Sequence, residues 1–369
     1  MIRRSVLAVL CGFLMLSGAQ AQPAAPAPQR VVNVYNWSDY VDPRVLEEFT
    51  AATGIQVIYD TYDNNEIVET RLLAGRSGFD VVVPSGAFLA RLIKAGVLAK
   101  VDRARLTQTE HIWPEIDRQL ARHDPGNAHA VNYMWGTVGI GLNARKVRER
   151  LGQALPLNSW DLLLKPELAS KLKDCGIHVL DAPEDIVPGI LKALGLNPDS
   201  KDQKDWQRAI DALMRVRPSI ARVHSSAYIN ALATGNACLV IGYSGDILQA
   251  RKRAEDAKNG VEITYEIPRE GALMWFDSMA IPADAPNMAE AHAFIDWMMR
   301  PEIAARNANL TAFASGNLTA RSLVKPELVV DPNIYPNADM LKRLFTAGAP
   351  DDRMQAVIGR LWSRFRAGR

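Results

Sequence analysis

The sequence predicts an α/β protein of about two globular domains. Segments typical of strands and of helices alternate along the chain, as they do where helices cover a largely parallel sheet. The 369 residues correspond to about two domains at roughly 100–200 residues each. With 48% hydrophobic residues, the chain has enough apolar side chains to form packed cores.

The charge of the chain is nearly balanced. It has 43 lysines and arginines against 41 aspartates and glutamates, for a formal net charge of +2. Proteins that bind DNA or RNA usually present a clustered basic face, and this balance gives no sign of one. Disordered chains combine low hydrophobicity with high net charge, and this sequence has neither property. We therefore expect a folded protein with no nucleic-acid partner.

The first 21 residues have the parts of a secretory signal peptide. A basic start (MIRR) precedes an apolar run over 5–16, and small residues follow at Ala19 and Ala21. A membrane anchor needs about 20 apolar residues, and this run is shorter. Lipid attachment at Cys11 is disfavoured, because Leu10 before it is too large for that cleavage. We expect export, with cleavage after Ala21.

Cleavage there leaves a formally neutral chain with two cysteines. Arg3 and Arg4 leave with the signal peptide, so the basic side chains then match the 41 acidic ones. Cys11 leaves as well, and Cys175 and Cys238 remain. In an oxidising compartment two thiols most simply form one disulfide, and two buried free thiols are the alternative. The sequence leaves both open, since it does not give the Cα distance that a bridge requires.

The mature chain begins with a short arm and then alternates strands and helices. Residues 22–30 are rich in Pro and Ala, which is typical of a flexible arm. A helix is expected over 43–53, where Asp42 is a cap, Pro43 takes the first helical position and Gly54 ends the helix. The other elements expected here are strands at 31–35, 55–59 and 79–83 and a helix at 65–74.

The alternation continues in the second half with a new set of elements. The apolar, glycine-punctuated segment 133–142 is expected to be a strand that crosses between two lobes. The further helices are expected to begin near Trp160 and to cover 186–194 and 246–258. The further strands are expected at 177–180, 237–242, 261–267 and 278–281. No internal repeat is present.

Aromatic and acidic residues recur together at the ends of the expected strands. In open α/β sheets, ligands bind beyond the carboxyl ends of strands. The segments concerned are 37–40, 84–85, 181–185 and 243–246, and 275–277 before the expected strand at 278. A cationic amine suits this combination, because π faces attract its charge and carboxylates accept from its N–H groups. Taken singly, an aromatic is more often a core residue and an aspartate more often a cap, Asp246 included.

Sequence motifs of enzymes are absent from the chain. It has no GxSxG elbow, no Gly-rich phosphate loop followed by Lys-Ser/Thr, and no HExxH. Its six histidines include no i, i+4 pair typical of zinc ligands, so no metal and no cofactor is predicted. His224 lacks an acidic partner at a defined spacing, and we expect it to be a packed or capping residue. The sequence thus favours an exported solute receptor over an enzyme.

Six segments together resemble the periplasmic polyamine-binding proteins, and above all the putrescine receptors of polyamine ABC transporters. This family belongs to the bacterial extracellular solute-binding proteins. The resemblance covers the chain from about residue 31 to its end. The segments are YNWSDY at 35–40, GFD through PS at 78–85, SWD at 159–161, LDAPE at 180–184, HSS at 224–226 and IGYSGD at 241–246.

The resemblance implies a type II periplasmic binding-protein fold, in which two α/β lobes joined by crossing strands close over a ligand. It implies a monomeric receptor that captures putrescine or spermidine in the periplasm and delivers it to the membrane permease of an ABC transporter. It also implies a Cys175–Cys238 disulfide. The ligand-binding residues that it implies are Trp37, Ser38, Asp39, Tyr40, Ser85, Asp185, Tyr243, Asp246, Trp275, Asp277 and Phe313.

Within that set, the resemblance assigns roles to two ends of the ligand. Asp246 and Asp277 would bind one ammonium group between the aromatic walls Trp37, Tyr243 and Trp275. The other amine would be bound, partly through water, by Ser38, Asp39 and Asp185.

Four positions depart from the pattern of the putrescine receptors, which typically have Glu, Trp, Phe and Tyr there. In this chain those positions are Asp185, Tyr243, Trp275 and Phe313. The shorter Asp185 leaves room for water or a longer ligand. Together with Ala87, where related pockets differ in side-chain size, these changes leave the choice between putrescine and spermidine open.

The expected division of the chain combines the element order with the resemblance. Its parts are a signal peptide at 1–21, an arm at 22–30, the first lobe at 31–136 and 259–320, the second lobe at 137–258, and a C-terminal helical segment at 321–369 that packs on the lobes.

Two other functions remain compatible with the sequence. An exported hydrolase or transferase could use Asp246 and Asp277 as an acid/base pair. A receptor of the same fold could bind an amino acid or a sugar instead of a polyamine.

Overall fold

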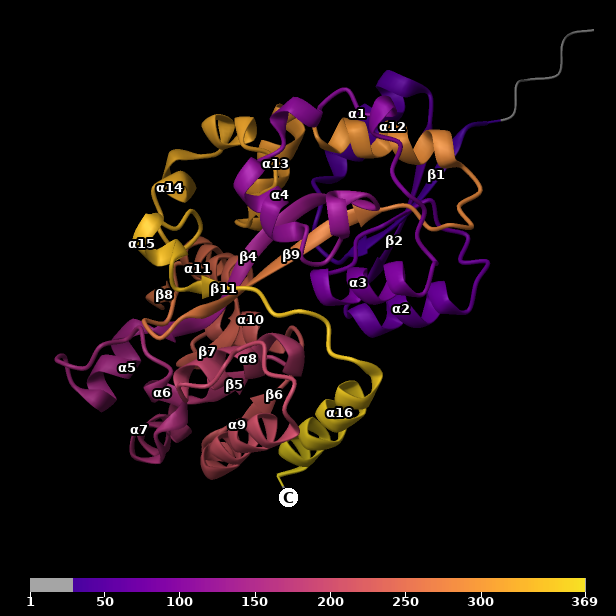
Figure 1. Ribbon diagram of the computed structural model, residues 1–369. Helices are drawn as coiled ribbons and strands as arrows, with labels where there is room; N and C mark the ends of the chain where they lie inside the picture. Colours follow the sequence, from indigo (N-terminus) through magenta and orange to yellow (C-terminus); the bar gives the residue numbers. More distant parts are fainter. Residues whose placement is uncertain (1–28, 369) are drawn as a thin grey trace, which may run out of the picture.

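Two α/β lobes joined by two long strands make up the part of the chain that the computed structural model describes, residues 29–368 (Figure 1). The expected signal peptide at 1–21 lies outside the described residues, as does most of the expected arm at 22–30. Within residues 29–368, no helix combines the length and the apolar character needed to cross a bilayer.

The first lobe is built on a sheet with the strand order β2-β1-β3-β9-β4. Strand β1 pairs in parallel with β2 and with the two-residue β3, as expected of an α/β sheet, whereas β3 and β9 are antiparallel. The bounds are β1 Val31–Trp37, β2 Gln56–Tyr62, β3 Val81–Val82, β4 Ala130–Asn143, β9 Ala272–Ala280 and β10 Ala314–Ser315.

The second lobe continues the same path with β7, β5 and β6. Strand β4 pairs with β9 over residues 130–137 and then with β7 and β8 over residues 138–143, so it runs from one lobe into the other. The expected crossing strand at 133–142 is therefore confirmed. The bounds are β5 Ile177–Val179, β6 Arg222–Val223, β7 Leu239–Tyr243, β8 Ile263–Glu266 and β11 Leu344–Phe345.

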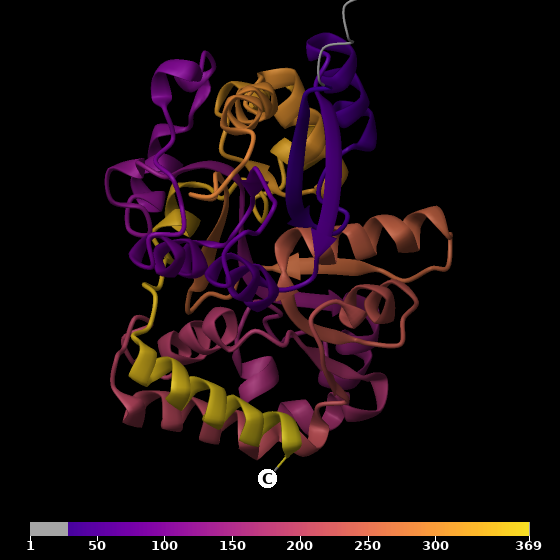
Figure 2. The same cartoon turned by 90° about the vertical axis from the view of Figure 1, so that its right-hand side faces the viewer.

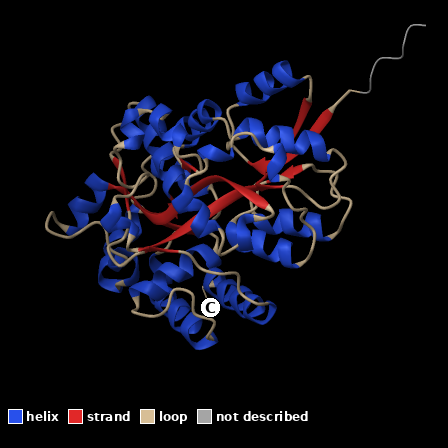
Figure 3. Ribbon diagram, turned by 45° about the horizontal axis from the view of Figure 1, so that its top comes forward, coloured by secondary structure: helices blue, strands red, loops and turns tan. Residues whose placement is uncertain are grey.

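Helices flank the strands, which run through the middle of the molecule (Figure 3). Those associated with the first lobe are α1 Pro43–Thr53, α2 Asn65–Leu73, α3 Gly86–Lys94, α4 Pro114–Leu120, α12 Met288–Met298 and α13 Pro301–Thr311. Those associated with the second lobe are α5 Ala144–Leu151, α6 Asp161–Leu164, α7 Pro166–Leu172, α8 Pro183–Ala193, α9 Gln203–Val216, α10 Ala227–Ala233 and α11 Ser244–Asp256.

The C-terminal segment returns to the second lobe. After the short helices α14 (Pro326–Val329) and α15 (Ala338–Leu341), the long helix α16 (Asp352–Ala367) packs on α9 and α8. In Figure 2 it is the yellow helix that lies along that lobe. The apolar stripe of α16, which includes Trp362 and Phe365, is buried in this contact.

The capping residues in the sequence correctly predict both ends of α1. The Asp42 carboxylate accepts from the backbone N–H of Arg44, Pro43 opens the helix, and Gly54 ends it with a left-handed backbone (φ 70°). A side chain at that last position would be strained, so glycine suits this end of the helix.

One expected element is wrong. Residues 275–277 were expected to precede a strand at 278–281, but they lie inside β9, the second crossing strand, which begins at Ala272. All nine residues of β9 are buried, so neither face shows the polar alternation that marks a half-exposed strand. Trp275 and Asp277 are two residues apart and therefore project from the same face of this strand.

The two cysteines of the described chain form a disulfide. Cys175 precedes β5 and Cys238 precedes β7, two strands that pair in parallel, and the Cα atoms are 5.5 Å apart. Of the two alternatives left by the sequence, the bridge is confirmed. It lies within the second lobe.

Candidate functional site

A cavity that is partly open to solvent lies between the lobes. It is lined from both lobes and from the crossing strand β9. All eleven residues expected at the ligand line it: Trp37, Ser38, Asp39, Tyr40, Ser85, Asp185, Tyr243, Asp246, Trp275, Asp277 and Phe313. The fold thus brings together every residue of the expected set.

Asp277 is the most buried carboxylate of this cavity, with 6% of the residue exposed. Its two oxygens accept hydrogen bonds from the Tyr40 hydroxyl (2.8 Å) and the Ser85 hydroxyl (2.5 Å). Desolvation by burial raises the pKa of Asp277 to about 7, and the two hydrogen bonds oppose that rise. Strand β9 therefore supplies a carboxylate whose orientation is already fixed. Among the described side chains, none forms an ion pair with it.

Two further carboxylates come from the second lobe, each held by a tyrosine. Asp246, in the first turn of α11, accepts from the Tyr228 hydroxyl (2.5 Å), and Asp185, in the first turn of α8, accepts from the Tyr243 hydroxyl (2.6 Å). Desolvation by burial raises the pKa of Asp246 to about 6 and that of Asp185 to about 7. The alternative that Asp246 caps its helix is wrong, because Tyr243 is the N-cap residue of α11.

The side chains that line this cavity give it an acidic character. Five aspartates face it, including Asp63 on the rim, against one basic residue, Arg253. Desolvating several carboxylates together is unfavourable unless a cation compensates them. The cavity is therefore suited to a ligand with two or more positive charges.

Aromatic rings form the apolar walls of the cavity. The ring of Trp275 meets that of Phe313 edge to face with centroids 4.9 Å apart, and that of Tyr243 at 5.6 Å. The Trp37 indole donates to the carbonyl of Val83 (3.0 Å), which fixes its orientation. Rings held in this way provide faces for methylene groups and for an ammonium charge.

The solvent side of the cavity is formed by the loop after β1. The Ser38 hydroxyl donates to Asp63 (3.0 Å), and Asp39 is exposed with a left-handed backbone (φ 56°). A bulky or β-branched residue would be strained in that conformation, whereas aspartate tolerates it. These polar groups lie where a ligand amine would still contact water.

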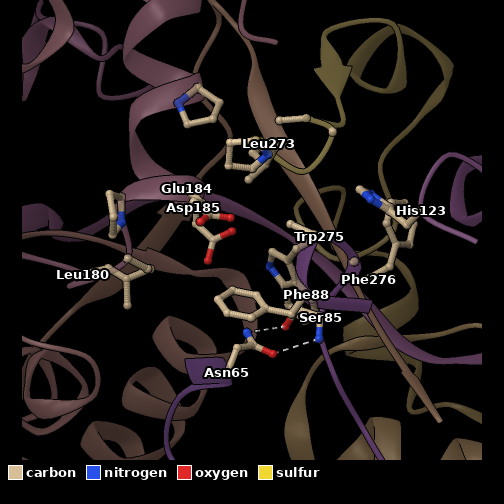
Figure 4. A pocket seen from close by; sticks show the side chains of 18 of the residues that line it. Asn65, Ser85, Phe88, His123, Leu180, Glu184, Asp185, Leu273, Trp275 and Phe276 are labelled. Atoms are coloured by element: carbon tan, nitrogen blue, oxygen red, sulfur yellow. Dashed lines mark hydrogen bonds between the residues drawn. The ribbon is translucent and has the colours of Figure 1, made fainter. Parts of the chain in front are cut away.

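A second cavity adjoins the first, and we call it the second chamber. The two share wall residues, among them Trp37, Asp185 and Trp275. In Figure 4 the carboxylates of Glu184 and Asp185 lie side by side at its wall, and two dashed hydrogen bonds of 3.0 Å join Asn65 to Ser85. The cavity system thus continues past Asp185.

Some lining residues were not anticipated from the sequence. Ser225, Ser226, Ile229, Gln249 and Arg253 line the first cavity, and Tyr228 holds Asp246 from behind. Of these, only the serines lie in a segment that the resemblance singled out. The others come from α10 and α11, two helices that pack on each other, and sequence spacing does not reveal that contact.

His224 caps a helix, as expected. Its Nδ1 accepts from the backbone N–H groups of Ser226 and Ala227 (both 3.1 Å), at the start of α10. This role accounts for the histidine without any catalytic chemistry.

Ligand affinity is expected to rise between pH 5 and pH 8. Burial raises the pKa values of the three aspartates to about 6–7, so protons compete with a cation below that range, while an alkyl ammonium of pKa about 10 stays charged. Calorimetric titration with a diamine should show at least about tenfold tighter binding at pH 8 than at pH 5. Equal affinities at the two values would contradict these assignments.

The same shifts predict how the stability of the ligand-free protein depends on pH. Because each of these carboxyl groups binds a proton more tightly when folded, the folded state loses stability as the pH rises from about 4 through about 7. The increase in Tm caused by a diamine should accordingly be larger at pH 8 than at pH 5.

Comparisons with known proteins point to solute receptors. A family model of bacterial extracellular solute-binding proteins matches residues 44–336. A putrescine-binding periplasmic protein of Pseudomonas aeruginosa, SpuD, is 46% identical over 96% of this chain and 97% of its own. PotF of Escherichia coli, also named a putrescine-binding periplasmic protein, is 44% identical over 93% of each chain.

A solved structure matches the whole two-lobed fold. The spermidine/putrescine ABC transporter substrate-binding protein PotD of Streptococcus pneumoniae superposes with a TM-score of 0.77 at 29% identity. The match covers 92% of this chain and 99% of that one. The expected fold class is therefore confirmed.

Proposed function

The chain belongs to the bacterial extracellular solute-binding proteins, and on that premise we propose that it is a periplasmic receptor for a polyamine, with putrescine as its first ligand. The observation that carries this proposal is the cavity between the lobes, where Asp185, Asp246 and Asp277 face the same space between aromatic walls. The relatives named for putrescine binding support the same ligand.

In the bound state, each group of the site has a defined task. One ammonium lies between Asp246 and Asp277, and hydrogen bonds from the hydroxyls of Tyr228 and Tyr40 keep these two carboxylates in position. The methylene chain packs on Trp275 and Tyr243. The other ammonium is bound near Asp185 and the polar rim formed by the Ser38 and Asp39 loop. Charge-assisted hydrogen bonds at both ends set the direction of the ligand.

The receptor releases its ligand to the permease of an ABC transporter and carries out no reaction itself. The relatives found here are named as binding proteins, which supports this assignment over the hydrolase alternative. We propose that the mature chain is secreted by cleavage after Ala21 and acts as a monomer.

The lobe boundaries that we propose follow the strand pairing. The first lobe takes residues 31–136, and the second begins where β4 leaves β9 for β7. The segment 259–320 contributes to both, since β8 pairs with the second-lobe half of β4 before β9 crosses back. The C-terminal segment 321–369 packs on the second lobe through α16.

Closure of the lobes by the ligand is the expected consequence of a site built from both. A polyamine contacts both lobes at once only in the closed state, so it shifts the open–closed equilibrium toward that state. Small-angle scattering should show that putrescine reduces the radius of gyration, while a sugar or a monocarboxylic amino acid does not. Tryptophan fluorescence should change in parallel, because Trp37 and Trp275 line the cavity. A radius that is unchanged at saturating putrescine would contradict this mechanism.

A further inference from the structure

An ion pair spans the two lobes at the wall of the second chamber. Arg91 on α3 of the first lobe directs its Nη1 to both carboxylate oxygens of Glu184 on α8 of the second lobe, at 3.3 and 3.4 Å. The same guanidinium binds Glu69 of α2 (2.7 and 3.1 Å) and lies 3.8 Å over the ring of Phe88. Arg91 is thus fixed in place by three neighbours, two of them anionic.

Glu184 is the carboxylate that a longer ligand would reach next. It is the residue before Asp185 in the sequence, and both carboxylates lie side by side in the close view (Figure 4). Two of the other acids that line the second chamber are already engaged, whereas Glu66 at its wall is exposed to solvent. The Asp181 carboxylate accepts from the Trp362 indole (2.7 Å) and lies 3.4 Å from Arg366, and Asp199 is paired with Lys201 (3.0 Å).

A diamine and a triamine differ in what they require from this chamber. A diamine is satisfied by the Asp246–Asp277 end and by Asp185, all of which line the first cavity. The additional aminopropyl arm of a triamine would extend past Asp185 and bring a third ammonium to Glu184. There it would meet a carboxylate already bound to a guanidinium, and that guanidinium repels the ammonium at close range.

We propose that Arg91 is a specificity-determining residue that makes this receptor select diamines over triamines. Paired with Arg91, Glu184 is denied to a third ammonium, although it lines the cavity system beside Asp185. This inference rests on the proposed polyamine-binding function and goes beyond it by assigning the choice between putrescine and spermidine to a residue outside the expected ligand set. Arg91 lines neither cavity and acts through Glu184.

Two substitutions break the same ion pair but change the charge of the chamber in opposite directions. Arg91→Gln removes a cation and leaves Glu184 free to accept a third ammonium. Glu184→Gln removes the anion and leaves Arg91 less compensated. If the pair only held the lobes together, both variants would weaken both ligands equally. The ratio of spermidine to putrescine affinity therefore separates charge selection from a purely structural role.

The experiment is calorimetric titration of the full mature protein with putrescine and with spermidine. We expect the wild type to prefer putrescine, Arg91→Gln to raise the spermidine-to-putrescine affinity ratio by about tenfold, and Glu184→Gln to lower it. Arg91→Lys, which keeps the charge, should leave the ratio within about twofold of the wild type. The matched control is the exposed Glu115–Arg118 pair on α4, where Arg118→Gln and Glu115→Gln make the same charge changes away from both cavities and should not move the ratio.

The possible outcomes separate this inference from the function on which it rests. Ratios that move in the same direction in Arg91→Gln and Glu184→Gln, or that do not move, overturn the role of Arg91 while the receptor function stands. A wild type that prefers spermidine also overturns the role of Arg91 and leaves the receptor function standing. A wild type that binds neither amine overturns the proposed function and this inference together. If Arg91→Gln fails to fold, Arg91→Met, which removes the same charge, takes its place, and a ratio that does not rise in this variant contradicts the inference.

Discussion

Replacement of Asp277 by alanine is expected to weaken putrescine binding by about 2–5 kcal/mol, because the bound ammonium then loses a desolvated, charge-assisted hydrogen bond. The carboxylate is nearly fully buried and is oriented by Tyr40 and Ser85, so no other described group can take its place without moving. Titration of both proteins with putrescine at pH 8 measures the difference.

A second variant separates charge from packing at this position. Asp277→Asn keeps an oxygen that accepts from Tyr40 or Ser85 but removes the charge, and we expect a similar loss of affinity. Since burial makes the ionised carboxylate unfavourable in the ligand-free protein, this variant should unfold at the same or a higher Tm at pH 8. Asp256→Ala, at the exposed end of α11, is the matched control and should bind normally. Affinity of Asp277→Ala within twofold of the wild type would remove Asp277 from the site.

Loss of the Cys175–Cys238 bridge is expected to destabilise the protein by about 4 kcal/mol. The bridge joins two residues with a sequence separation of 63. In the chain-entropy model, a loop of this length lowers the conformational entropy of the unfolded chain enough to stabilise the folded state by about 4 kcal/mol. The double variant Cys175→Ala/Cys238→Ala should therefore show a lower Tm and a lower urea midpoint than the oxidised wild type.

Putrescine affinity provides the control for the disulfide. Neither cysteine lines a cavity wall, so the folded double variant should bind with unchanged affinity. Thiol counting on the denatured, unreduced mature protein should find no free thiol. Two free thiols, or a double variant as stable as the wild type, would contradict this account of the bridge.

The parts of the fold with strong local signals could be predicted from the sequence. Asp42, Pro43 and Gly54 mark both ends of α1, and the apolar run before Leu142 marks the crossing strand β4. Strand β9 was misplaced because burial on both faces removes the alternation that reveals register. Helices α9 and α10 were not predicted at all, although α9 has a clear apolar stripe from Trp206 to Val216.

The candidate site was predictable only in part. The eleven residues of the expected ligand set were identified by resemblance to a family, and the structure places them around one cavity. The neighbouring residues that hold carboxylates of the two cavities in place were not identified, among them Tyr228, which binds Asp246, and Arg91, which binds Glu184. These side chains approach from helices far away in the sequence, and their positions follow from tertiary packing rather than from spacing along the chain.

The central claim, that the cavity binds a polyamine without converting it, is tested most directly by calorimetry with a panel of solutes. We expect putrescine to bind at a single site with micromolar or tighter affinity, with cadaverine, spermidine and spermine as the amines for comparison and with no detectable binding of glucose or glutamate. Recovered putrescine should be chemically unchanged. If none of the four amines binds while a neutral sugar does, or if the amine is consumed, the receptor assignment is wrong.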